Sequence, residues 1–140
     1  MKIVINKCYG GFGLSPIAFK KWAERKGKTI YFFVADEADI NKMVPIDIQS
    51  IEGKTYYAFD SPDMPERATE YNDFYAKHHV YDHDINREDT DLVAVVEELG
   101  EKASGHYAKL SVVEVPDGVD YKIEEYDGIE WIAEKHRTWG

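Results

Sequence analysis

The stretch NKCYGGFGLSP, residues 6–16, links an apolar run to the best-signalled helix start in the chain. Residues 2–6 are almost uninterruptedly apolar and β-branched, which predicts a buried strand. Ser15 is a good N-cap, and Pro16 stands at the first helical position, where its missing N–H costs nothing. The stretch therefore predicts a strand, a glycine-rich loop and a helix in direct succession, with Gly27 ending the helix.

Two further signals define the rest of the fold. An apolar stripe follows the capping cluster Asp89-Thr90-Asp91 and predicts a second helix that Gly105 closes. Asp127-Gly128 predicts a hairpin whose return strand is 129–137, with a helix from Ile129 as the alternative. Other strands are predicted at residues 29–34, 46–51, 55–59, 107–115 and 119–126, the second and third forming a hairpin.

These elements predict one α+β domain over residues 1–140. We expect a mostly antiparallel sheet with two main helices packed on one face. From residue 60 to 89 the pattern dissolves, and this segment is predicted to be irregular or mobile, although residues 66–77 also fit a short helix.

Composition limits the partners of the chain. Its 140 residues contain 17 Lys and Arg against 27 Asp and Glu, a formal charge of −10, which repels nucleic acid and anionic lipid. Cys8 is the only cysteine, so an internal disulfide and a cysteine-based zinc site are excluded. No signal-peptide or membrane-spanning apolar run is visible, so we expect a soluble intracellular protein, in keeping with a reducing cytosol.

The glycine-rich loop is the first candidate site. A glycine turn between a strand and a helix N-terminus can direct free N–H groups at an anion. The candidate ligand-binding residues here are Lys7, Tyr9, Gly10, Gly11, Phe12, Gly13 and Ser15. The pattern matches neither named nucleotide fingerprint, and the alternative is a tight turn whose aromatic side chains pack on the core.

The C-terminal segment is the second candidate. His136, Arg137 and Trp139 combine a titratable donor, a permanent cation and an aromatic plate, a set suited to holding a phosphate and stacking a base. The alternative is that Trp139 anchors the chain end and Arg137 pairs with a surface acid.

Other polar clusters have simpler explanations. Residues 78–84 (HHVYDHD) hold three imidazoles and two carboxylates, types that bind divalent metal, but their spacing matches no metal-ligand motif, which favours a solvated polar loop. Cys8 fits a buried inert thiol better than a nucleophile. The carboxylates of Glu97, Glu98 and Glu101 lie opposite the apolar stripe of the second helix and form its wet face.

Three stretches resemble a widespread group of small, mostly uncharacterised proteins encoded by tailed phages and prophages. They are residues 5–15 (INKCYGGFGLS), residues 92–105 (LVAVVEELGEKASG), and residues 112–139 with their EYDG and EKHRTW segments. The resemblance implies a viral accessory protein acting in the bacterial cytoplasm. It brings no catalytic residues with it.

Three functional hypotheses follow. The first is a non-enzymatic binder of a phosphorylated small molecule, for instance a nucleotide immune signal that a phage sequesters, with no cofactor. The second is an acidic inhibitor that docks on the basic groove of a host defence or nucleic-acid enzyme. The third is a small metal-dependent hydrolase using residues 78–84. Direct nucleic-acid or membrane binding is not expected, and a sheet this small is compatible with a homodimer.

Overall fold

The computed structural model describes residues 1–51 and 53–135. In this part of the chain the helices are α1 (Pro16–Arg25), α2 (Tyr71–His78) and α3 (Thr90–Leu99). The strands are β1 (Lys2–Asn6), β2 (Tyr31–Ala35), β3 (Met43–Pro45), β4 (Tyr57–Phe59), β5 (Leu110–Glu114), β6 (Tyr121–Tyr126) and β7 (Ile129–Glu134). The strand pairs are antiparallel, so the predicted α+β class is confirmed.

The chain folds into two compact units, which are described one at a time. The first consists of Met1–Ala18 and Asp82–Gly140, and the second of Phe19–Tyr81. In place of the single predicted sheet, the strands form a β1-β5 pair, a three-stranded β3-β2-β4 sheet and a β6-β7 hairpin. Helix α3 packs on β1 and β5 as predicted for one of the two helices, whereas α1 runs from one unit into the other.

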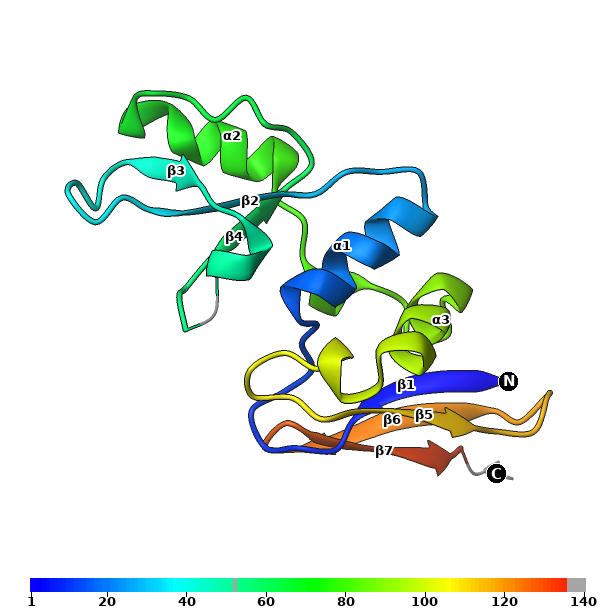
Figure 1. Cartoon of the computed structure of the whole chain (residues 1–140). Helices are drawn as coiled ribbons and strands as arrows, with labels where there is room; N and C mark the ends of the chain where they lie inside the picture. Colours follow the sequence, from blue (N-terminus) through cyan, green and yellow to red (C-terminus); the bar gives the residue numbers. More distant parts are fainter. Residues whose placement is uncertain (52, 136–140) are drawn as a thin grey trace, which may run out of the picture. The chain divides into compact units, whose positions relative to one another are not determined.

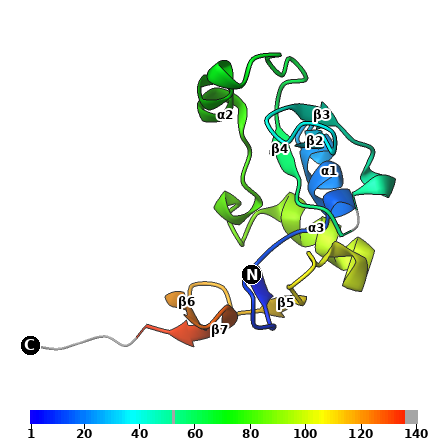
Figure 2. The same cartoon turned by 90° about the vertical axis from the view of Figure 1, so that its left-hand side faces the viewer.

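The first unit has three layers, with the β1-β5 pair in the middle (Figure 1). Alternation along β1 sends Ile3 and Ile5 to one face, where they form a core with Ile123 and Ile132 of the hairpin. Helix α3 lies on the other face and buries its apolar stripe there. Figure 2, from a second direction, shows the hairpin beside the central strands, with α3 above them. Burial on both faces explains why β1 is nearly all apolar.

The helices of this unit begin where the sequence predicts. Asp89 accepts hydrogen bonds from the N–H groups of Asp91 (2.8 Å) and Leu92 (3.1 Å), which caps α3. The Oγ of Ser15 accepts from the Ala18 N–H at 3.3 Å, which caps α1. The α-helical part of α3 ends earlier than predicted, at Gly100 with φ +59°, and a 3-10 turn continues to Ala103.

The predicted Asp127-Gly128 turn is confirmed. Both residues have positive φ (50° and 92°), as a two-residue turn of this hand requires. The return segment is the strand β7 rather than a helix.

The second unit is built around β2, which pairs with β3 on one side and with β4 on the other. This corrects the predicted hairpin of residues 46–51 and 55–59. Pro45 ends β3 because it has no N–H to donate, and Ile48–Ser50 form a 3-10 turn instead of a strand.

Residues 60–89 are more regular than predicted. They contain α2, whose Phe74 packs with Phe33 and Phe59 in the core of the second unit. Short 3-10 turns precede and follow this helix, at 68–70 and 82–84. Burial of Phe74 therefore orders a segment whose sequence shows no clear hydrophobic periodicity.

Candidate functional site

Several donors of the glycine-rich loop are used inside the protein. The N–H of Leu14 donates to Oδ2 of Asp82 at 2.9 Å, and that of Ser15 to the Ala103 carbonyl at 2.9 Å. The N–H of Gly10 reaches the Asp127 carbonyl at 3.4 Å. Since the Ser15 hydroxyl is also engaged, the loop is not the open row of amide donors that the anion-site hypothesis expects.

The glycines themselves are explained by close approach of other backbone segments. A side chain on Gly10, whose φ is +117°, would meet Cβ of Tyr107 at 2.7 Å. A side chain on Gly128 would meet the backbone nitrogens of Gly10 and Gly11. Residues 8–13 therefore form a joint with the 127–128 turn and the 105–107 loop, and Figure 1 shows these segments at one end of the first unit. We call this contact the glycine joint.

The side chain of Asn6 holds the segments of the glycine joint together by hydrogen bonds. It is fully buried, donates from Nδ2 to the carbonyls of Cys8 and Gly128 (both 2.8 Å), and accepts from the Lys109 N–H at 2.8 Å. One amide side chain thus binds β1, the loop, the hairpin turn and the start of β5 together.

β5 pairs with one edge of β1, and the largely buried ion pair of Arg87 and Glu130 lies along the other edge. The carboxylate of Glu130 accepts the Asn6 N–H at 2.8 Å and two bonds from the Arg87 guanidinium at 2.6 and 2.9 Å. The Arg87 carbonyl accepts the Val4 N–H at 2.9 Å, and its guanidinium lies 3.6 Å from the ring centre of Phe12. Phe12, a predicted ligand-binding residue, is therefore covered by Arg87.

Two lysines lie opposite each other beside the joint. The Lys7 N–H donates to the Lys109 carbonyl at 2.8 Å, which extends the β1-β5 register by one pair beyond Asn6–Leu110. Both lysines are exposed, and the Lys109 N–H donates to Oδ1 of Asn6. Among residues 1–51 and 53–135, neither has a carboxylate within 4.0 Å.

The structure brings part of the predicted site together and adds residues to it. Lys7 and Tyr9, two of the candidate residues, are exposed at the joint. Lys109, Tyr107 and Tyr126 join them from other segments and were not predicted. The β1-β5 register is the signal that would have found Lys109. His136, Arg137 and Trp139 lie outside the described residues.

Residues 78–84 do not form a metal site within the described part of the chain. No group of three or more His, Cys, Asp or Glu side chains there is placed to hold an ion. His78 Nδ1 lies 2.8 Å from Oδ1 of Asp60 in the second unit, and Asp82 holds the Leu14 N–H in the first. Cys8 is half-buried and belongs to no such group.

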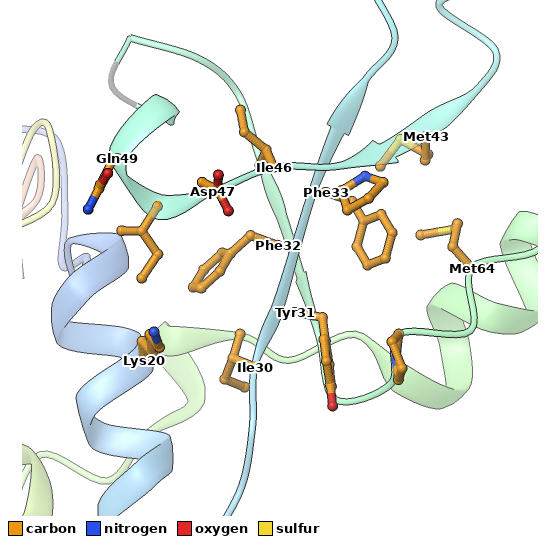
Figure 3. A pocket seen from close by; sticks show the side chains of 13 residues that line it. Lys20, Ile30, Tyr31, Phe32, Phe33, Met43, Ile46, Asp47, Gln49 and Met64 are labelled. Atoms are coloured by element: carbon orange, nitrogen blue, oxygen red, sulfur yellow. The ribbon is translucent and has the colours of Figure 1, made fainter.

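The second unit has a surface groove of about 760 Å³ along β2. Figure 3 shows Phe32 and Ile30 on one side of the strand and Phe33 with Met43 and Met64 on the other. Lys20, Asp47 and Gln49 add polar groups to the groove. It contains none of the predicted site residues.

The acidic charge is concentrated in the first unit. That unit holds 8 Lys and Arg against 16 Asp and Glu, so its formal charge is 8 minus 16, or −8. The second unit holds 9 and 11, or −2. The unpaired lysines of the joint therefore stand out against the most acidic part of the chain.

None of the described helices is both long and apolar enough to cross a membrane. Comparison with protein-family models, curated proteins and solved structures found no match.

Proposed function

We propose that this protein binds a phosphorylated small molecule, without catalysis, at the surface formed by Lys7, Lys109 and the exposed side chains of the glycine joint. The observation that carries the proposal is the lysine pair. Two like charges directly opposite each other on neighbouring strands destabilise a sheet, and an anion bound between them removes that cost.

The surroundings of the two lysines support an anionic ligand. The first unit has twice as many acids as bases, yet Lys7 and Lys109 have no carboxylate partner in the part of the chain described. The N–H groups of Tyr9, Phe12 and Gly13 also have no acceptor among these residues, so some donors of the loop remain beside the lysines. The bound anion is small, because a charge of −8 on this unit opposes a long polyanion.

The resemblance of three sequence stretches to tailed-phage and prophage proteins sets the proposed context. In that context the protein is a phage accessory protein in the cytoplasm of the bacterial host, and binding sequesters a phosphorylated metabolite or nucleotide signal. Recovery of the bound compound unchanged after incubation is expected; its dephosphorylation or cleavage would contradict the non-catalytic part of the proposal.

Isothermal titration calorimetry with nucleoside mono-, di- and triphosphates and cyclic dinucleotides tests the binding. The double variant K7Q/K109Q is expected to lose at least tenfold in affinity for any compound that the wild type binds. The matched control K28Q/K42Q removes two exposed lysines of the second unit and is expected to bind like wild type. Equal affinity of the three proteins would refute the lysine pair as the site.

A second candidate function is the acidic inhibitor of a host enzyme, which the concentration of charge in the first unit favours. Its test is charge reversal in the helical segment, E98K/E101K, against the matched reversal D63K/E66K in the second unit. If the first variant alone releases a host protein that the wild type captures, and salt does the same, the inhibitor hypothesis replaces the ligand binder.

A further inference from the structure

Tyrosine side chains are exposed on three sides of the glycine joint. Tyr9, Tyr107 and Tyr126 keep 61%, 69% and 72% of their surface accessible to solvent. Isolated exposed aromatic residues are ordinary, but three from separate segments at one place are not.

The contacts of the joint show that these residues come together. Gly10 follows Tyr9 directly, and a Cβ placed on Gly10 would lie 2.7 Å from Tyr107 Cβ. Its N–H reaches the carbonyl of Asp127, the residue after Tyr126. The three tyrosine backbones are therefore neighbours, although almost a hundred residues separate the first from the second.

Hydrogen bonds hold the backbone segments that carry the tyrosines. Asn6 bonds the loop, the hairpin turn and the start of β5, and His106 contacts the Tyr107 ring edge-on with ring centres 4.5 Å apart. A rigid aromatic side chain has little rotational freedom to lose on binding, so a flat ligand is bound with a small entropy cost.

From this arrangement we infer that the ligand is a nucleotide, whose base stacks on the tyrosines while its phosphate meets Lys7 and Lys109. The inference rests on the proposed function and narrows its ligand class. Stacking requires only an aromatic face, which every base has, and the lysine pair supplies the charge that a phosphate needs. A sugar phosphate would use the lysines alone.

The test compares two probes, adenosine monophosphate and ribose 5-phosphate, by calorimetry with wild type, Y9A, Y107A and K7Q/K109Q. Alanine keeps Cβ, so Y107A preserves the contact of Tyr107 with Gly10. I40A, which removes an exposed apolar side chain of the second unit, is the control.

The expected result separates the two parts of the site. Y9A and Y107A lose about tenfold or more in affinity for the nucleotide but bind ribose 5-phosphate like wild type, and I40A changes neither. K7Q/K109Q weakens both probes.

Any one of four results would overturn the inference. If the tyrosine variants bind the nucleotide like wild type, or if the wild type binds both probes equally, the base does not stack there, while the phosphate site stands. Tighter binding of a single-stranded oligonucleotide than of the mononucleotide would make nucleic acid the ligand. If no phosphorylated compound binds at millimolar concentration, the proposed function fails as well.

Discussion

The carboxylate of Glu130 joins three segments of the first unit. It is 9% exposed and accepts hydrogen bonds from the backbone of Asn6 and from both terminal nitrogens of Arg87. A buried ion pair adds little net stability compared with apolar packing, but removing one partner leaves the other charge buried and uncompensated.

E130A is therefore expected to reduce the free energy of unfolding by about 3–5 kcal/mol. The matched variant E97A breaks the exposed Lys2–Glu97 pair and should cost less than about 1 kcal/mol. Urea denaturation followed by circular dichroism measures both. Similar costs for the two would show that the Arg87–Glu130 pair does not hold the edge of β1.

Gly128 tests the close packing of the glycine joint. G128A places a Cβ against the backbone nitrogens of Gly10 and Gly11 at a φ of +92°, and it should destabilise the protein by about 1–3 kcal/mol. G118A is the matched control, because Gly118 has a similar φ of +82° but open space around it. The difference between the melting temperatures of G128A and G118A measures the clash with the backbone of Gly10 and Gly11. Equal melting temperatures would show that Gly128 does not pack closely against that backbone.

Tyr75 in the second unit gives a prediction about pH. The hydrogen bond with the Tyr81 hydroxyl, at 2.7 Å, is the main cause that raises the pKa of Tyr75 from 10 to about 12. A raised pKa means that the fold favours the neutral phenol, so this contribution to stability is full below pH 10 and is lost as pH rises to about 12.

Y81F is expected to lower the pKa of Tyr75, which ultraviolet titration of tyrosinate detects as earlier ionisation of one group. Y126F serves as the control, because Tyr126 is exposed and makes no described contact with Tyr75. If the remaining tyrosines of Y81F show no group that ionises earlier than in wild type, the hydroxyl pair is absent in solution.

At the scale of single elements, the capping signals were the most reliable part of the sequence. D89A removes the two side-chain hydrogen bonds that begin α3 and should cost about 1 kcal/mol. D84A, a nearby exposed acid, should leave the free energy of unfolding within about 0.5 kcal/mol of wild type. Equal losses would assign the effect to charge rather than to capping.

The elements that sequence predicts well are those whose signals are local. The start of α1, the start of α3 and the Asp127-Gly128 turn depend on residues within a few positions of each other. Non-local pairing was predicted less well. The choice of β2 as the partner of both β3 and β4, and the order that Phe74 gives to α2, depend on contacts that no local pattern records.

The candidate site shows the same division. Lys7 and Tyr9 were predicted because they belong to a conspicuous loop, whereas Lys109, Tyr107 and Tyr126 reach it only through the β1-β5 register and the hairpin turn. The glycines were predicted as part of an anion site, but their main role is to let three backbone segments touch.

Across the whole molecule, the two units differ in net charge and in how many aromatic side chains they expose. The first unit carries −8 of the total −10 and also presents the glycine joint with its three exposed tyrosines. The second unit is nearly neutral, and Phe33, Phe59 and Phe74 form a buried aromatic core in it. The proposed binding role therefore belongs to the first unit, and a homodimer stays a prediction.

Amide-detected NMR titration with adenosine monophosphate shows whether a nucleotide binds at the glycine joint. A nucleotide bound at the glycine joint causes saturable shifts confined to residues 7–13, 106–109 and 126–128, which K7Q/K109Q abolishes while its own spectrum stays that of a folded protein. Shifts confined to the groove along β2, or no shifts at millimolar nucleotide, would contradict it.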